Sequence, residues 1–278
     1  MKKCGLVEVA ACIQLNHSEH MTSNKPFQFE ITHSELRWLA EVLGYVQFPF
    51  LGVPNKNESD TDLEAEMKMA QAKMQERGLA TYLPGAGWQV ERLVIALTQM
   101  IANPDSVQML QTWKKNGTTK RAFVYPNLDV SLFAEETNAL EFTFHSGPSG
   151  LVAQKQAFFG LPTKIPISKK KFHIPASLIH LIMTPKAGVL TASLEETGFD
   201  KKKATELTNF LGHISLIGIQ TIYNSTEGDL CVHEKKCLIY NNKGIWGGVL
   251  EHALQSIEFI PLKRPEVFKW LGHLQVVD

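Results

Sequence analysis

Residues 101–125 read IANPDSVQMLQTWKKNGTTKRAFVY, and the change of hydrophobic period inside this stretch decides the fold class. Before its proline, apolar residues recur at helical spacing. After it, Val107–Lys115 and Arg121–Tyr125 are rich in β-branched and aromatic residues. Asn116-Gly117, a dipeptide typical of two-residue hairpin turns, separates these two runs. The stretch therefore predicts a helix followed by an antiparallel hairpin.

Three helices are expected before this point. Thr32–Glu35 is a capping box, in which a hydroxyl accepts a backbone N–H and a glutamate bonds back to the cap; an apolar stripe follows it to Gly44. A second apolar stripe, Leu63–Met74, ends at the sequence RGLA, and Val90–Ile101 forms the stripe of a third helix. The segment Glu76–Leu93, ERGLATYLPGAGWQVERL, is interpreted as the connection between the second and third helices.

Short strands follow the helices rather than alternating with them, which is typical of α+β proteins. Beyond the first hairpin we expect strands at Val130–Glu135, Leu140–His145 and Leu151–Phe159. The order then repeats, with helices at Ile174–Met183, Ala192–Thr197 and Lys202–His213, strands at Ile214–Tyr223, Leu230–Tyr240, Ile245–Leu250 and Ser256–Pro261, and a last helix at Pro265–Leu274.

The repeated order predicts an α+β fold in which a central antiparallel β-sheet is flanked by two helical subdomains, with duplicated halves related by a pseudo-twofold axis. We expect a poorly ordered N-terminal segment at 1–26, a first half at 27–165 and a second half at 166–278, both sharing one sheet. Translation could also begin at Met21. The halves match best where Val94, Leu97 and Ile101 correspond in spacing to Leu207, Phe210 and Ile214.

Composition narrows the function classes. The 278 residues carry 28 basic and 28 acidic side chains, so no overall field attracts nucleic acid. No apolar run is long enough to span a membrane. The four cysteines form no disulfide framework, which fits a reducing cytoplasm.

A metal site is the first chemistry to consider. Cys231, His233 and Cys237 share one face if a single regular strand runs through them. Such a strand would place the two cysteines roughly 20 Å apart, too far for one ion unless a hairpin folds them together. No CxxC pair supplies further ligands, so we expect no metal.

Catalytic and phosphate motifs are incomplete. Ser146–Gly150 lacks the glycine spacing of a nucleophile elbow, and Gly85-Ala86-Gly87 lacks both a third glycine and a lysine. We therefore expect no catalytic residue and no cofactor. Two alternatives stay open: an enzyme whose site is assembled from scattered side chains, and a winged-helix regulator built on Leu63–Thr98. Against the second, Gln89–Ile101 has Arg92 as its one cation, balanced by Glu91.

Large apolar groups at the ends of elements are the remaining candidates for function, because those left exposed would form a groove for a partner helix. They lie in Phe48–Leu51, Phe158–Pro162 and Ile245–Leu250. The partner-binding residues predicted from these runs are Phe158, Phe159, Leu161, Trp246 and Val249.

The chain resembles the EspG family of type VII secretion chaperones. The resemblance is carried by ITHSELRWLAEVLG, by the helix ending in ERGLA, by QVERLVIALTQMIANP with its change into a strand meander, and by GIWGGVLEHALQSIEFIPLKRPEVFKWLGHL. It covers most of the chain from about Phe27 onward.

The resemblance implies a bacterial, cytoplasmic, non-enzymatic chaperone or adaptor. Its client would be a helical secreted protein of the PE/PPE or a related type, recognised through the sheet and the C-terminal helical subdomain. Neither nucleic acid nor a membrane would be a partner, and the protein would be a monomer or a weak homodimer. The chain is rich in Lys, Asn, Gln and His for this family, so a different client on the same scaffold is also compatible.

Overall fold

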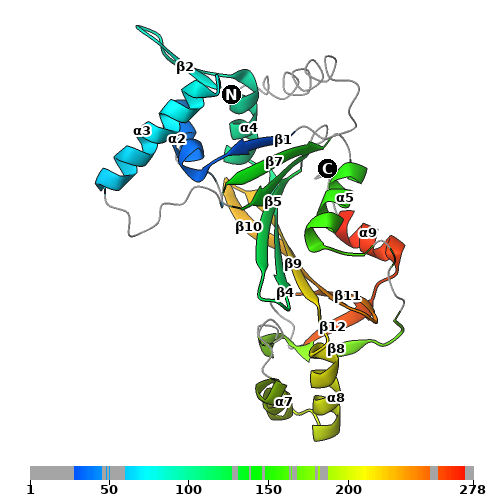
Figure 1. Ribbon diagram of the computed structural model, residues 1–278. Helices are drawn as coiled ribbons and strands as arrows, with labels where there is room; N and C mark the ends of the chain where they lie inside the picture. Colours follow the sequence, from blue (N-terminus) through cyan, green and yellow to red (C-terminus); the bar gives the residue numbers. More distant parts are fainter. Residues whose placement is uncertain are drawn as a thin grey trace. The chain divides into compact units, whose positions relative to one another are not determined.

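The computed structural model describes residues 28–45, 48, 50, 60–126, 131–137, 139–145, 148–162, 164, 168–178, 181, 187–250 and 256–272 (Figure 1). They fall into two compact units. The described parts of Met1–Asp105 and Tyr125–Ser146 form the first, and those of Ser106–Val124 and Gly147–Asp278 form the second. The predicted poorly ordered segment at 1–26, including Met21, lies outside the described residues.

Ten strands form one antiparallel sheet in the order β1-β7-β6-β5-β4-β9-β10-β11-β12-β8. This order confirms the predicted α+β class with a large antiparallel sheet. A helix followed by four strands occurs twice, as α4 with β4 to β7 and as α8 with β9 to β12. The short strands β1 and β8, which precede these two blocks, pair with the last strand of each.

The spacing of the repeat differs from the predicted one. The ends of α4 and α8 lie 109 residues apart, and β4 and β9 begin 110 residues apart. Leu97 therefore corresponds to Glu206 by the helices or Leu207 by the strands, rather than to Phe210. Ile214 follows the end of α8 and has no helical counterpart.

The described part of the first unit contains five strands and three helices. Its elements are β1 (Gln28–Ile31), α2 (His33–Leu43), α3 (Asp60–Glu76), β2 (Ala80–Leu83), β3 (Gly87–Val90), α4 (Arg92–Ala102), β6 (Ser131–Glu136) and β7 (Leu140–His145). The capping box is confirmed: the Glu35 backbone N–H donates to the Thr32 hydroxyl, and the Thr32 N–H donates to the Glu35 carboxylate. Gly44 ends α2 in the left-handed conformation.

Arg77, the arginine of the RGLA sequence, connects several elements of this unit. Its guanidinium donates to the buried carboxylate of Glu35 at 3.1 Å and to the carbonyl of Glu30 at 2.6 Å, and it lies over the ring of Phe29. One side chain at the end of α3 thus bonds to the first turn of α2 and to the edge strand β1. Because Gly78 follows with a φ of 69°, the chain can turn back at once into β2.

The second unit contains most of the sheet. Its elements are β4 (Ser106–Lys114), β5 (Thr119–Tyr125), α5 (Pro148–Phe159), β8 (Phe172–Pro175), the 3-10 turn η1 (Ala176–Leu178), α7 (Ala187–Glu196), α8 (Lys201–Leu211), β9 (Leu216–Thr226), β10 (Asp229–Asn241), β11 (Gly244–Val249), β12 (Ser256–Pro261) and α9 (Arg264–Gly272). The last residue of β5, Tyr125, belongs to the first unit.

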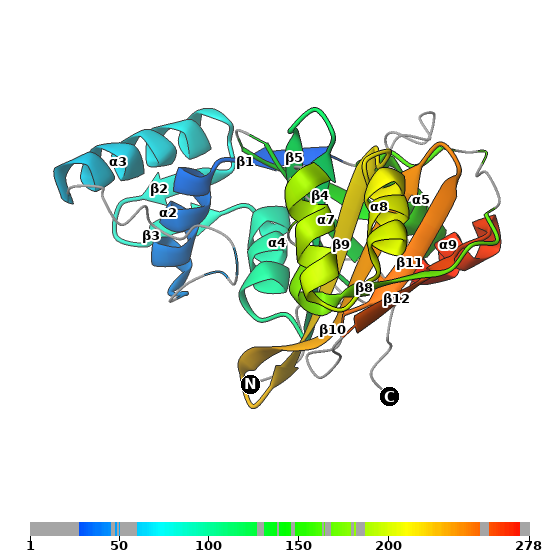
Figure 2. The same ribbon diagram turned by 90° about the horizontal axis from the view of Figure 1, so that it is seen from below.

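Two helix pairs cover opposite sides of these strands. The paired helices α5 and α9 lie on one side, where Phe159 packs on Gly218 and Trp270 packs on Gly247 (Figure 1). The pair α7 and α8, seen side by side in Figure 2, contributes to a hydrophobic cluster with alternate strand residues such as Ile217.

Two local predictions were wrong. Leu151–Phe159 is helix α5 rather than a strand, because the buried Lys155 occupies a core position and hides the helical period. Ile174-Pro175 ends strand β8 instead of opening a helix. The predicted connection between the second and third helices is confirmed, and it is formed by the hairpin β2–β3, whose four-residue strands are too short to show clear alternation.

None of the described helices is long and apolar enough to cross a membrane.

Because α5 packs closely on β9, we predict that one methyl group added at this contact lowers the stability of the second unit. In Gly218→Ala the new Cβ would lie 2.5 Å from the Phe159 ring, so we expect a loss of about 1–3 kcal/mol of unfolding free energy in urea titration. Gly188→Ala in α7 is the matched control, since its Cβ meets no atom within 4 Å. An equal loss in both variants would contradict this close approach.

Candidate interaction surface

The residues predicted to bind a partner lie mostly in the core. Phe158, Phe159, Leu161 and Trp246 are all buried, whereas Val249 is 39% exposed. Trp246 packs with Phe172 and Phe210 in the cluster under α7 and α8, and its indole N–H donates to the Lys170 carbonyl. Of the five, Val249 alone is exposed to a partner in this conformation.

The cysteines of β10 do not share a face. The pairing of β10 with β9 shifts by one residue between Val232 and Glu234, so Cys231 lies opposite Asn224 while Cys237 lies opposite Ile219. The bulge places the two cysteines on opposite sides of the strand. Burial raises the pKa of the Cys237 thiol to about 12, so this thiol stays protonated. Within the described residues, no group of three or more His, Cys, Asp and Glu could hold a metal ion.

A buried polar layer lies between α5 and the sheet. The Lys155 ammonium, which is fully buried, donates to the side-chain carbonyl of Gln108 and, at 2.8 Å, to the backbone carbonyl of Leu271 near the end of α9. The Gln220 amide donates to the same Gln108 oxygen at 2.9 Å. Lys155 therefore links α5, α9 and the centre of the sheet.

A second buried lysine adjoins this layer. Lys236 on β10 is paired with Gln220 in the strand register, and its ammonium lies 2.7 Å from the Glu234 carboxylate. This contact is an ion pair rather than a hydrogen bond. Burial, together with the nearby charge of Lys236, lowers the pKa of Lys155 to about 7.

Lys155 is placed to support the fold rather than to meet a substrate. A neutral lysine amine is a nucleophile in some enzymes, but a nucleophile must reach its substrate. Lys155 has no exposed surface, and both acceptors of its hydrogen bonds are protein oxygens. The layer accordingly serves to attach α5 and α9 to the sheet.

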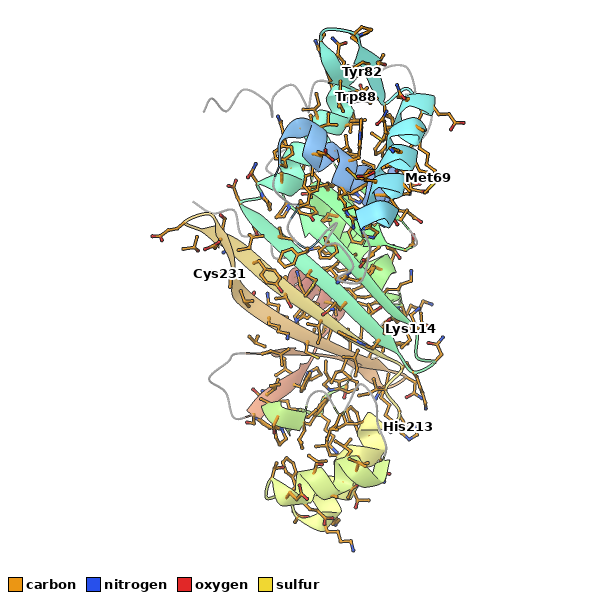
Figure 3. All side chains as sticks on the ribbon, turned by 90° about the vertical axis from the view of Figure 1, so that its left-hand side faces the viewer. Met69, Tyr82, Trp88, Lys114, His213 and Cys231 are labelled. Atoms are coloured by element: carbon orange, nitrogen blue, oxygen red, sulfur yellow. The ribbon has the colours of Figure 1, made fainter. Side chains whose placement is uncertain are left out.

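The opposite side of the central strands is only partly covered. Met109 and Tyr223 lie half-exposed on this side, where Met109 pairs with Thr221 and Val107 pairs with Tyr223. Gln111, also half-exposed, pairs with the exposed Arg121. Figure 3 views β4, β9 and β10 from this side, away from α5 and α9. We call Met109, Gln111, Arg121 and Tyr223 the open face.

The hairpin between β4 and β5 adds positive charge beside the open face. No acidic residue occurs between Asp105 and Asp129, and the four cations of this stretch, all exposed, are Lys114, Lys115, Lys120 and Arg121. The Lys115 ammonium also donates to the Gly212 carbonyl at the end of α8. The sequence KKNGTTKR is visibly basic, but the net charge of the whole chain, which is zero, does not reveal this local charge.

Comparison of sequences finds no matching protein family and no matching curated protein. Comparison of structures finds similarity to a solved structure of the Mycobacterium tuberculosis type VII secretion system chaperone EspG5 in complex with a PE25-PPE41 dimer. The TM-score is 0.59 at 11% sequence identity, over 88% of this chain and 94% of the other. At this identity the likeness establishes the fold, which is EspG-like.

The buried Lys155 predicts a dependence of stability on pH. Because its pKa is about 7 in the folded chain and 10.5 when unfolded, the unfolded state binds more protons between these values. Stability due to this group should therefore rise with pH over that window, by about 1 kcal/mol per pH unit.

The measurement is urea unfolding of the wild type and of Lys155→Met at pH 7 and pH 9. The unfolding free energy of the wild type minus that of the variant should be larger at pH 9 than at pH 7. A difference that stays constant or shrinks would show that the buried group is charged throughout.

Proposed function

We propose that the protein is a non-enzymatic chaperone or adaptor that binds a helical secreted protein. The proposal is supported by the similarity of its fold to that of EspG5, whose solved structure contains the PE25-PPE41 dimer. It is also supported by a surface suited to protein contact, the open face, which combines thioether, aromatic, amide and guanidinium groups.

The open face could receive a helix because it offers apolar contact at its centre and cations at its border. Met109 and Tyr223 supply apolar area in the middle of the strands, while Arg121 supplies charge at the side. Burial of apolar area drives association, and charged groups at the border increase the association rate and select partners of opposite charge. Val249, on the other side of the strands, stays a predicted partner residue.

The client that we propose is of the PE/PPE or a related type, bound in the cytoplasm by a monomer or weak homodimer. The described residues contain no grouping of His, Cys, Asp and Glu that would suit metal-dependent catalysis.

The charge of α3 argues against the winged-helix alternative. This helix is followed by the hairpin β2–β3, as a recognition helix is followed by a wing, but it carries five acidic side chains and two lysines. A helix of negative net charge repels the phosphate backbone, which supplies most of the affinity of DNA-binding proteins.

The test is co-expression with the small helical proteins encoded beside this gene. We expect one of them to co-purify in near-stoichiometric amount. The double variant Met109→Glu/Arg121→Glu should weaken that complex about tenfold or more in a titration, because it places two negative charges on the open face.

Ile260→Glu is the control for this test. Ile260 is 41% exposed, and its register partner Gly247 packs against α9, so the substitution adds a charge on the opposite side of the strands. The proposal fails if no neighbour binds, or if both variants weaken the complex equally.

A further inference from the structure

The hairpin β2–β3 is an apolar projection of the first unit. Figure 1 shows it extending beyond the end of α3. The twelve residues Leu79–Val90 include no charged side chain, and Tyr82 and Leu83 near the tip are 53% and 37% exposed. Exposed apolar side chains in an uncharged segment are typical of surfaces that bind another protein.

The hairpin is held to α2 through Trp88 and is closed at its base. The rings of Trp88 and Trp38 of α2 meet edge to face with centroids 5.0 Å apart. Tyr82 also meets Trp88 edge to face, at 5.3 Å, and both are labelled in Figure 3. The Glu91 N–H donates to the Leu79 carbonyl at 2.9 Å and closes the two strands. The hairpin is therefore presented in one orientation to whatever approaches it.

The hydrogen-bond pattern leaves the outer edge of β3 open. Antiparallel pairs alternate between bonded and non-bonded, and Glu91 with Leu79 is a bonded pair. Two steps along the ladder, Gln89 with Thr81 is bonded as well, whereas Val90 and Trp88 belong to the non-bonded pairs. Their backbone N–H and C=O groups point away from β2, and among the described residues no backbone hydrogen bond to them is recorded.

The edges of the main sheet are protected, in contrast to β3. The Arg77 guanidinium bonds to the Glu30 carbonyl of the edge strand β1. At the other edge, Lys171 precedes β8 and pairs with Glu258. Charged side chains of this kind prevent a sheet from pairing with other chains. A two-stranded sheet is also marginal by itself, since three strands are usually needed for stability.

We propose that the outer edge of β3 binds an extended, uncharged segment of another protein, which adds a third strand to the hairpin. The outward N–H and C=O groups of Trp88 and Val90 would bond to its main chain, and its apolar side chains would pack on Tyr82 and Trp88. This surface is separate from the open face, and the inference does not depend on the proposed client.

Two other occupants fit less well. A second copy paired through the same edge would bury only two four-residue strands, far below the roughly 1,000 Å² of a stable interface. An anionic membrane surface would be repelled by α3, which leads into the hairpin and carries five acidic side chains against two lysines.

Residue-resolved hydrogen exchange on the full chain tests the proposal. The probe is a short uncharged peptide of alternating threonine and valine, blocked at both ends and added at on the order of 1 mM, because so few hydrogen bonds give weak binding. The amides of Trp88 and Val90 should exchange about tenfold more slowly with the peptide, while that of Gln89, already bonded within the hairpin, should not change.

Val90→Pro removes one outward N–H without removing a bond of the hairpin, so it should abolish the slowing at Trp88. If this variant fails to fold, Gln89→Lys and Thr81→Lys form a second matched pair. Both residues are exposed and lie directly opposite each other, but Gln89 is on the proposed edge. The lysine at 89 should reduce peptide binding more than the lysine at 81.

Three results would overturn the proposal. The first is that the peptide leaves the exchange rates of the Trp88 and Val90 amides unchanged. The second is that the peptide protects Trp88 as strongly in the proline variant as in the wild type. The third is that a higher protein concentration slows these amides without any peptide, which would assign the edge to a second copy. The variant Met109→Glu/Arg121→Glu should bind the peptide normally, so a failed client experiment leaves this test intact.

Discussion

The second unit depends on the pairing of β4 with β9. Nine residue pairs join these strands, from Ser106 with Asn224 to Lys114 with Leu216, although the strands begin 110 residues apart in the sequence. Closing so long a loop costs conformational entropy before the contacts can repay it. The register of this pairing determines on which face of the sheet each side chain lies. A shift by one residue would turn Gly218 away from Phe159 and Gln220 away from Gln108.

Most of the strands could be predicted from the sequence because alternation and turn residues are local signals. β7 and β12 were predicted with their observed ends, and β4 within one residue. α5 could not be recognised, since Lys155 fills a core position that a hydrophobicity pattern assigns to solvent. Its partners, Gln108 on β4 and Leu271 on α9, are distant in the sequence. A buried lysine is visible only when the groups that satisfy it are brought together.

The predicted contact residues show a second limit of sequence patterns. Phe159 and Trp246 were predicted to contact a partner because they lie at the ends of expected strands. In the fold, a glycine on a strand makes room for an aromatic ring from a helix, as Gly218 does for Phe159 and Gly247 for Trp270. A glycine and the aromatic residue that packs on it need not be neighbours in the chain. Short sequence patterns therefore cannot distinguish an aromatic residue of the core from one of a binding site. The four-residue strands of the β2–β3 hairpin lacked a signal for a simpler reason, because they are shorter than one clear alternation.

Net charge is a property of the whole chain, whereas recognition depends on charge within a few side chains of the contact. The zero net charge argues against long-range attraction to nucleic acid, yet it sums an acidic α3 and a β4–β5 turn with four cations. At physiological salt, exposed charges are screened beyond about 8 Å, so each of these segments acts on its own surroundings. A partner of the open face, as proposed, would therefore be selected by the cations at its border. The proposed partner of the uncharged edge of β3 would be selected by main-chain geometry instead, so that one neutral protein could keep two binding surfaces distinct.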